Sequence, residues 1–201
     1  MKYTVKGKNT VDLDNKNFLA QGGEGSVYVI SKTAYKIYND PKKMLPIGKI
    51  QELSALTAKN IIKPENIILD NKNHEIGYTM RFVDDTYSLC QLFTKAFRQR
   101  NNLDHDTMFK LIQSLQNIVK HVHEKKILIV DCNELNFLAS KDFKDIYAID
   151  VDSYQTPNYP ATAIMDSIRD RHTKVFNEGS DWFSFAILAF QMFIGIHPFK
   201  R

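Results

Sequence analysis

The spacing of hydrophobic and polar positions changes near the middle of the chain. From Asn17 to Tyr38 the segments FLAQGGEGSVYVI and TAYKIY are separated by a short polar break, which predicts an antiparallel meander of strands. The runs IIKPENIILD and HEIGYTMRFV lie on either side of the turn-forming NKN and predict two further strands. Between these two regions, KIQELSALTAK has Ile50, Leu53 and Leu56 at helical spacing, which predicts a helix.

The second half, after Val83, is mainly helical in its spacing. YSLCQLFTKAF and TMFKLIQSLQNIVKHVHE predict two helices. The second of these has one apolar stripe, made of Phe109, Ile112, Leu115, Ile118, Val119 and Val122. The runs KILIV, FLAS and IYAIDVD then interrupt the helical spacing, and the last of them predicts a short hairpin with acidic residues at its ends.

A long apolar stretch, WFSFAILAFQMFIGI, follows a polar segment that runs from Ser153 to Ser180. The stretch is too short to span a bilayer comfortably, and it contains Ser184 and Gln191. We therefore expect a buried central helix that starts at Asp181. Because a strand-rich half precedes a helix-rich half, the sequence predicts an α+β fold.

Composition narrows the class of protein. The chain has 201 residues, of which 43% are hydrophobic, enough for one large domain or for a small lobe plus a larger one. Its 27 basic and 23 acidic side chains are interspersed without a basic stripe, so we expect no specific nucleic-acid partner. Cys90 and Cys132 lie far apart without a Cys-x-x-Cys spacing, and the N-terminus lacks the apolar core of a signal peptide. These features favour a reducing, cytoplasmic compartment and no membrane partner.

QGGEGSVY is a turn between two predicted strands, and its glycines would let backbone N–H groups approach phosphate oxygens. An ordinary glycine hairpin is the more frequent reason for such a turn. Lys36 favours phosphate binding over an ordinary hairpin, because a lysine in the middle of the strand TAYKIY is costly unless its ammonium reaches an anion. Glu52, on the helix that follows, would supply a carboxylate, and a nucleotide would supply phosphates. The alternative is an edge-strand lysine that faces water.

Two further groups of polar residues follow apolar runs. Asp131 and Asn136 lie five residues apart in the loop of ILIVDCNELNFL, and Asp150 and Asp152 lie at the strand end of YAIDVDSYQ. Phosphoryl transfer needs a carboxylate that orients a hydroxyl and hard oxygen ligands that hold magnesium on the phosphates. Asp131, Asn136 and Asp150 supply that set, although each alone is more often a turn or capping residue.

The order of these parts resembles that of the eukaryotic-like protein kinases, from about residue 17 to the last residue. A glycine loop, a strand lysine, a helix glutamate, an Asp-x-x-x-x-Asn loop and a strand-end aspartate follow one another as in that family. His123 stands eight residues before Asp131, and DWFSFAILAFQMFIGIHPF is similar to the family's buried central helix, whose opening aspartate, here Asp181, braces the catalytic loop. DVDSYQ and GSDWFSFAILAFQMFIGIHPF also resemble small kinase-like proteins of bacteria and bacteriophages.

The resemblance implies a bilobal kinase-like fold that binds ATP between its lobes. The N-lobe, with an antiparallel sheet, would cover residues 1–83, and a mainly helical C-lobe that ends after the central helix would cover residues 84–201. Val27 would cover the adenine, and Lys36 would hold the α- and β-phosphates and pair with Glu52. Met80 would lie at the back of the adenine pocket, ahead of a hinge over residues 81–83. The nucleotide-binding set implied is Gly22, Gly25, Val27, Lys36, Glu52, Met80, Phe82 and Val83, with Ala20 at the first glycine position.

The resemblance assigns the chemistry to the second lobe. Asp131 would act as base or orient the acceptor hydroxyl, with Lys36 and Asn136 completing the catalytic set. Asn136 and Asp150 would bind magnesium. Asp152 competes with Asp150 as ligand, and we favour Asp150 because the alternation in IYAID places it directly after the strand.

Several positions depart from the family's pattern. His-Arg-Asp reads Ile129-Val130-Asp131, so the arginine that receives a phosphorylated activation loop is missing. The lysine two residues after the catalytic aspartate is Asn133, which removes one positive charge from the transferring phosphate. YPATAIMDSIRDR occupies the place of the Ala-Pro-Glu element, so the family's mode of docking substrates does not carry over.

Three functions are compatible with this pattern. The first is an ATP- and magnesium-dependent protein kinase that acts on Ser or Thr hydroxyls of a protein substrate. The second is a pseudokinase, a binding or scaffold module that Asn133 and the missing docking element would explain. The third is a kinase-fold phosphotransferase with a small-molecule acceptor. Magnesium-dependent turnover separates the first from the second, and the class of acceptor separates the first from the third.

Overall fold

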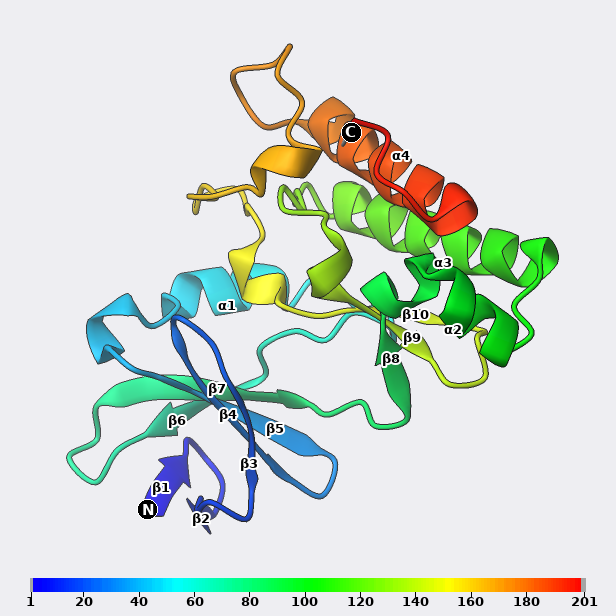
Figure 1. The fold of residues 1–201 in the computed structure, drawn as a ribbon. Helices are drawn as coiled ribbons and strands as arrows, with labels where there is room; N and C mark the ends of the chain where they lie inside the picture. Colours follow the sequence, from blue (N-terminus) through cyan, green and yellow to red (C-terminus); the bar gives the residue numbers. More distant parts are fainter. Residues whose placement is uncertain (1, 200–201) are drawn as a thin grey trace. The chain divides into compact units, whose positions relative to one another are not determined.

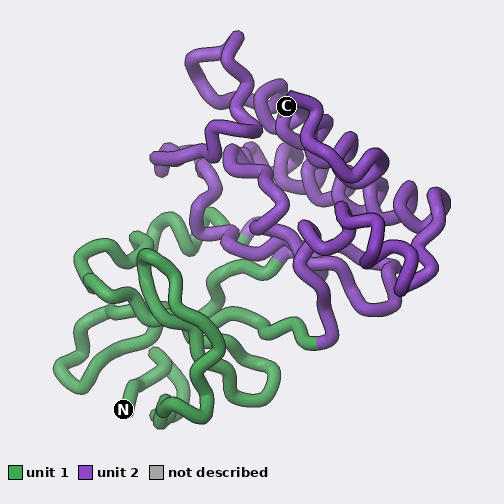
Figure 2. The backbone as a smooth tube through the Cα atoms, viewed as in Figure 1, with its two compact units in different colours: residues 1–54, 62–84 green, residues 55–61, 85–201 purple. Residues whose placement is uncertain are grey.

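The structure is a computed structural model that describes residues 2–199. Its backbone divides into two compact units, drawn in two colours in Figure 2. Unit 1 consists of Met1–Ser54 and Ile62–Asp84, and unit 2 consists of Ala55–Ile61 and Asp85–Arg201. Each unit is described separately below.

Unit 1 is built on one antiparallel sheet with the strand order β2-β1-β6-β7-β5-β4-β3 (Figure 1). The strands are β1 (Lys2–Val5), β2 (Thr10–Asp12), β3 (Phe18–Gln21), β4 (Gly25–Ile30), β5 (Thr33–Tyr38), β6 (Asn66–Leu69) and β7 (Glu75–Arg81). The predicted meander is therefore present as β3, β4 and β5. Strands β1 and β2 were not predicted, because the N-terminal residues are mostly charged and polar.

One face of this sheet is covered by an apolar cluster of Val5, Leu13, Tyr35, Ile68 and Ile76. Successive side chains of a strand point to opposite faces, so Lys36 lies on the face opposite to Tyr35. Strand β5 pairs with β4 on one side and with β7 on the other, and the side chain of Lys36 is buried. The alternative of a water-facing lysine on an edge strand is therefore wrong.

Helix α1 (Ile47–Leu53) is shorter than the helix predicted over KIQELSALTAK. It starts after Pro46, and it ends at Ser54, whose hydroxyl donates to the carbonyl of Gln51 at 2.6 Å. Beyond that point, in unit 2, the N–H groups of Thr57 and Ala58 donate to the imidazole Nε2 of His121 at 3.1 and 3.3 Å. These donors have partners outside a helix, so the helical spacing of Leu56 did not extend the helix.

Unit 2 combines a small sheet with helices. The sheet has the order β10-β9-β8, with β8 (Thr86–Ser88), β9 (Phe137–Ser140) and β10 (Ile146–Ala148) all antiparallel. Strands β9 and β10 form a hairpin, in which IYAIDVD supplies only one strand, Ile146–Ala148, and FLAS supplies the other. The α-helices are α2 (Lys95–Arg100), α3 (His105–Glu124) and α4 (Glu178–Ile194), and the 3-10 turns include η1 (Pro41–Lys43, in unit 1), η2 (Leu89–Phe93), η3 (Glu134–Asn136), η4 (Val151–Ser153) and η5 (Asp166–Ile168).

Two expected helices of unit 2 have different boundaries in the structure. YSLCQLFTKAF contains the end of β8, η2 and the start of α2, because Thr94 is extended and caps α2 by accepting from the N–H of Phe97. In α3, Phe109 is 51% exposed, whereas Met108 and Leu111 are buried. The buried stripe is therefore shifted from the predicted one at its N-terminal end.

The strand predicted over IIKPENIILD is also shorter in the structure, where only Asn66–Leu69 is a strand.

Helices α3 and α4 pack against each other (Figure 1). Helix α4 begins at Glu178, three residues before the predicted start, because Asn177 and Ser180 form a reciprocal capping box. It ends at Gly195, which has a positive φ of 87° that suits glycine. Within the described part of the chain, no helix combines the length and apolar character needed to cross a membrane.

Candidate nucleotide and phosphoryl-transfer residues

The glycine turn connects β3 to β4 at the edge of the sheet in unit 1. Gly22 donates its N–H to the carbonyl of Gly25 at 2.9 Å, which closes the turn. A Cβ at Gly25 would collide with the carbonyl oxygen of Ile37 on the neighbouring strand, whereas one at Gly23 would meet open space. Gly25 is thus required by the close approach of β4 and β5, and the tip of the turn at Gly23 and Glu24 is exposed.

Lys36 lies in register with Val27 on β4 and with Tyr78 on β7. Its ammonium stands 5.3 Å from the ring centre of Tyr38 and 5.9 Å from that of Tyr78. The alkyl part of the side chain is therefore packed among apolar groups, and the charged end is favoured by the two aromatic faces. This arrangement fixes where the ammonium is held.

Glu24, at the tip of the glycine turn, supplies an acidic partner that the sequence did not indicate. Its carboxylate Oε2 lies 3.5 Å from the Nζ of Lys36, and the Glu24 side chain is 69% exposed while that of Lys36 is 11% exposed. The pair is thus an exposed carboxylate reaching a nearly buried ammonium. The pairing of Lys36 with Glu52 stays a prediction.

The predicted hinge follows the end of β7. The N–H of Phe82 donates to the carbonyl of Lys32 at 2.8 Å, so this group is already engaged within unit 1. Met80 pairs with Ala34 inside the sheet and is partly buried. Phe82 and Val83 both lie beyond the end of β7, and adenine recognition by this segment stays a prediction.

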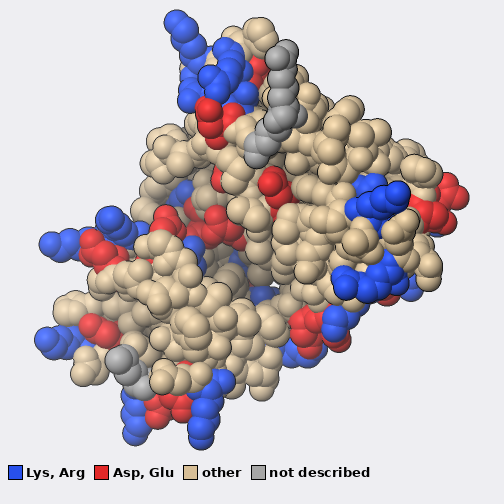
Figure 3. Space-filling view, in the orientation of Figure 1, with Lys and Arg blue, Asp and Glu red and all other residues tan. Residues whose placement is uncertain are grey.

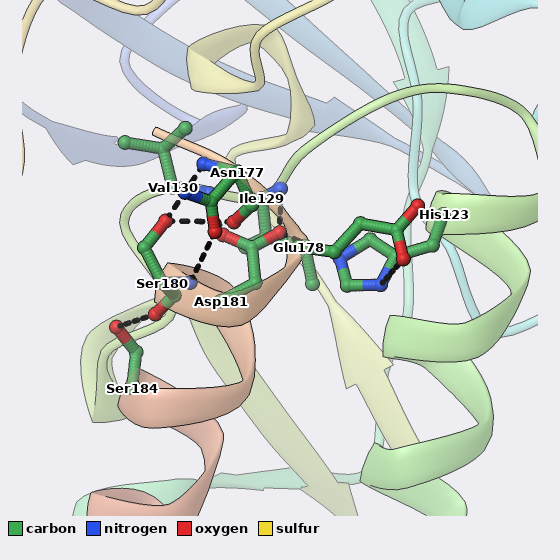
Figure 4. Close-up of polar contacts among 8 residues, drawn as sticks. All are labelled: His123, Ile129, Val130, Asn177, Glu178, Ser180, Asp181 and Ser184. Atoms are coloured by element: carbon green, nitrogen blue, oxygen red, sulfur yellow. Dashed lines mark hydrogen bonds and ion pairs between the residues drawn. The ribbon is translucent and has the colours of Figure 1, made fainter. Parts of the chain in front are cut away.

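In unit 2, Asp181 contacts the backbone of Ile129 and Val130 (Figure 4), the two residues that precede Asp131. The carboxylate of Asp181 is completely buried, and it accepts from the N–H of Ile129 and the N–H of Val130, both at 2.8 Å. The same carboxylate lies 2.9 Å from Nε2 of His123, whose ring packs edge-on against Trp182. Residues from α3, the loop and α4 therefore meet at a single carboxylate.

Val130 has an uncommon backbone conformation, with a positive φ of 61°. A β-branched residue in this region is strained, at a cost of roughly 1–3 kcal/mol. The N–H of Asp131 donates across it to the carbonyl of Ile129 at 2.7 Å, which makes a tight three-residue turn. Asp181 accepts hydrogen bonds from the N–H groups of Ile129 and Val130, the first two residues of this turn. These hydrogen bonds offset the backbone strain at Val130 and stabilise the turn that directs Asp131 out of the loop.

Asp131 is surrounded by donors to its two carboxylate oxygens. Oδ2 accepts from Nδ2 of Asn133 at 2.9 Å, and Oδ1 accepts from the N–H of Met165 at 2.7 Å. Asn133 is itself fixed, because it is buried and its Oδ1 accepts from the N–H of Leu135 at 2.8 Å. The sequence indicated Asn133 only as a missing lysine, and its role in orienting Asp131 was missed because it depends on the path of the loop.

Asn136 and Asp150 are brought near each other by a backbone bond. The N–H of Ile149, next to Asp150, donates to the carbonyl of Asn136 at 2.9 Å. The side-chain Nδ2 of Asn136 donates to the carbonyl of Asp131 at 2.9 Å, and among residues 2–199 no group donates to its Oδ1. The amide is therefore pinned with its oxygen left as a potential ligand.

Asp150 and Asp152, the two candidate magnesium ligands after β10, differ in exposure. Asp150 is exposed and has a left-handed backbone with φ of 57°, whereas Asp152 is buried in η4. Strand β10 ends at Ala148, so Asp150 follows the strand after one residue. Within the described residues no cluster of three or more His, Cys, Asp or Glu could hold a metal ion. Magnesium is commonly bound by one or two carboxylates plus substrate phosphates, and Asn136 and Asp150 fit that donor set.

Cys132, which belongs to this loop, and Tyr154 are both buried. Burial raises the pKa of the Cys132 thiol well above its usual value, and Asp181 and Asp131 add to the effect. Burial also raises the pKa of Tyr154. Both groups are therefore neutral at physiological pH.

Comparison with known proteins gives a structural match. No family model and no curated protein matches the chain. Its structure is similar to one described as the ROP18 kinase domain in complex with AMP-PNP and sucrose, with a TM-score of 0.67 and 14% sequence identity. The match covers 98% of this chain and 68% of that chain. The narrower resemblance to bacterial and bacteriophage proteins has no support from these comparisons. With its curled antiparallel sheet in one unit and its helices in the other, the chain has a protein kinase-like fold.

Proposed function

We propose that this chain is an ATP- and magnesium-dependent protein kinase that transfers the γ-phosphate to Ser or Thr hydroxyls. The observation that carries the proposal is the loop of unit 2, in which Asp181 fixes the backbone of Ile129 and Val130 and thereby aims Asp131. A kinase-like fold alone would not carry it, because unrelated functions share folds. The cytoplasmic location expected from the sequence belongs to this proposal.

Unit 1 would contribute the contacts with the nucleotide. In this proposal the ammonium of Lys36 meets phosphate oxygens, the turn that runs from Gly22 to Gly25 offers backbone N–H groups at its exposed tip, and Val27 lies against the adenine. The similar ROP18 kinase domain was solved with AMP-PNP, which supports nucleotide use by this fold. The exposed carboxylate of Glu24 pairs with the ammonium of Lys36 in this structure, so a phosphate would have to displace that carboxylate.

Unit 2 would contribute the acceptor chemistry and the magnesium ligands. Magnesium, when bound, neutralises charge on the phosphate oxygens and orients them. Asn136 Oδ1 and the carboxylate of Asp150 would hold it. Asp131 would orient the acceptor hydroxyl and take up its proton as the hydroxyl oxygen bonds to the γ-phosphorus and ADP leaves. Asn133 keeps the carboxylate of Asp131 in one orientation through the 2.9 Å hydrogen bond to Oδ2.

A pseudokinase is the second candidate, and one contact favours it. The N–H of Met165 donates to Oδ1 of Asp131 at 2.7 Å, on the carboxylate that an acceptor hydroxyl would use. Asn133 also lacks the positive charge that a lysine would bring to the transferring phosphate. In this second proposal the chain binds ATP and partners without turnover.

Transfer of labelled phosphate from ATP, with magnesium, to lysate proteins tests the two candidates. We expect transfer by the natural chain, and loss of at least about a thousandfold in Asp131→Asn with ATP affinity unchanged, because Asp131 acts on the acceptor. Asp145→Asn, an exposed carboxylate beside β10, is the matched control and should transfer normally. Equal transfer by Asp131→Asn would overturn the proposed kinase mechanism. ATP binding without any transfer would establish the pseudokinase.

A further inference from the structure

Unit 2 has a hollow beside the start of α4 that the proposed chemistry does not use. Its volume is about 540 Å³, within the range of small-ligand sites, and its walls combine arginines with aromatic rings. We call it the arginine groove, and its principal lining residues are Asp166, Arg169, Arg171, His172, Phe183 and Phe199. In the space-filling view, Lys and Arg side chains gather over the loop that precedes α4 (Figure 3).

Hydrogen bonds from Ser184 and His197 hold the backbone at Ser167 and Ile168, and Ser167 lines the groove. The hydroxyl of Ser184 on α4 donates to the carbonyl of Ile168 at 2.9 Å, and Nε2 of His197 lies 3.0 Å from the carbonyl of Ser167. The other nitrogen of His197 accepts from the N–H of Phe199 at 3.1 Å. Nε2 of His197 therefore donates to the carbonyl of Ser167, while Nδ1 accepts. The groove is a formed feature of this unit.

The aromatic wall is apolar and partly open. The rings of Phe183 and Phe199 stack with a centroid distance of 6.1 Å and an interplanar angle of 9°. Phe199 is 68% exposed, so this ring offers a face to an incoming side chain. An apolar or aromatic residue of a partner would gain burial here.

The cationic wall has charge that the chain itself does not neutralise. Within residues 2–199 the guanidinium of Arg169 has neither an ion pair nor a hydrogen bond, and the residue is exposed. Arg171 pairs with Asp166 at 2.6 Å, but both side chains are more than two-thirds exposed, at 71% and 76%. Asp170 is turned to its own loop, where it accepts from the N–H of His172 and the hydroxyl of Thr173. Arg169 is thus available to an anionic partner, and Arg171 is held only by an exposed pair.

The groove is also next to the candidate acceptor site. Met165, whose N–H donates to Asp131, directly precedes Asp166 in the groove wall. One short segment therefore touches the carboxylate proposed to orient the hydroxyl and forms the edge of the groove. A polypeptide whose hydroxyl reached Asp131 would run along this segment.

We propose that the arginine groove binds the acceptor polypeptide itself and selects segments that have glutamate or aspartate beside an apolar or aromatic residue. The inference rests on the proposed function, because it names the class of protein that the kinase phosphorylates. Asp166 and Asp170 stand among the basic residues of this loop, so the groove matches a short acidic segment better than a continuous polyanion.

Peptide binding without nucleotide tests the groove directly. The probes are a fluorescent serine peptide rich in glutamate with one phenylalanine, and its matched peptide in which glutamine replaces every glutamate. We expect the natural chain to prefer the glutamate peptide, and added salt to reduce that preference. Arg169→Gln should weaken glutamate-peptide binding by roughly two- to fivefold, the range of an exposed ion pair. Asp166→Asn should strengthen it, because Arg171 loses its internal competitor.

Lys120→Gln, the same loss of charge on an exposed position of α3, is the control and should bind like the natural chain. Equal binding of both peptides, or Arg169→Gln indistinguishable from Lys120→Gln, overturns the inference. Displacement of the peptide by millimolar inorganic phosphate also overturns it, since the groove would then be a small-anion site. If phosphate is also transferred preferentially to the glutamate peptide, and the variants rank in transfer as they do in binding, both proposals are supported. Selective binding with no transfer would reject the proposed function while the peptide groove stands.

Discussion

Lys36 in unit 1 and Asp131 in unit 2 are held in place by different kinds of bonds. Lys36 sits on an inner strand, where the ladders of β4 and β7 fix its backbone and leave its ammonium to an exposed carboxylate. Asp131 sits in an irregular loop with a left-handed residue before it, and a buried carboxylate from α4 fixes that loop. The first position depends on strand register, and the second depends on one distant side chain.

This difference predicts where each unit is vulnerable. A strand residue keeps its backbone geometry when a neighbouring side chain changes, because many backbone hydrogen bonds of the sheet fix the strand together. The loop depends on a few charged hydrogen bonds that cannot be replaced by water in a buried site. Substitutions should therefore damage unit 2 through its polar network and unit 1 mainly through its backbone spacing.

The largest effect is expected for Asp181→Ala. The change leaves the N–H groups of Ile129 and Val130 buried without an acceptor, which should lower the free energy of unfolding by about 3 kcal/mol. Chemical denaturation monitored by circular dichroism measures it. Asp145→Ala, which removes an exposed carboxylate in the same unit, is the control and should have the stability of the natural chain. If the two variants have the same stability, Asp181 is an ordinary helix residue and the account of the loop is wrong.

A smaller effect is expected for Gly25→Ala in unit 1. The new Cβ would collide with the carbonyl oxygen of Ile37, so the strands would have to separate, at a cost of about 2 kcal/mol. Gly23→Ala in the same turn places its Cβ in open space and should be nearly neutral. Thermal unfolding of the two variants compares them. Equal losses would mean that the turn, and not the spacing between β4 and β5, determines stability here.

The smallest effect is expected for Glu24→Gln. Removing the carboxylate takes away one competitor of phosphate for the ammonium of Lys36, so ATP affinity should rise by about two- to fivefold, the range of an exposed ion pair. Isothermal titration with ATP gives the value. Weaker binding would show that Glu24 helps to hold the nucleotide and does not compete with it.

Much of unit 1 and the long helices were predictable from the sequence, since β3 to β5, α3 and α4 have clear strand or helix spacing. The ordered motif also indicated Lys36, Asp131 and Asn136 as candidates. Strands β1 and β2 were missed because they are short and largely polar, and their place in the sheet comes from pairing with β6 and with each other.

The contacts that set the candidate site were not predictable in the same way. Glu24 reaches Lys36 across a turn, and Asn133 orients Asp131 within an irregular loop, so neither contact leaves a periodic signal. The helix predicted over residues 49–59 stopped early because His121, distant in sequence, accepts the N–H groups of Thr57 and Ala58. Such tertiary hydrogen bonds override local propensity.

Titration of ATP with and without magnesium into the natural chain, Lys36→Ala and Asp150→Asn tests the proposed function most directly, through the separate contributions expected of Lys36 and Asp150 to ATP binding. We expect Lys36→Ala to weaken binding about tenfold under both conditions, because the ammonium meets phosphate directly. Asp150→Asn should weaken binding only when magnesium is present, because it removes a metal ligand. Asp152→Asn, the neighbouring buried carboxylate, should retain the magnesium dependence. ATP binding that neither substitution changes would contradict the account.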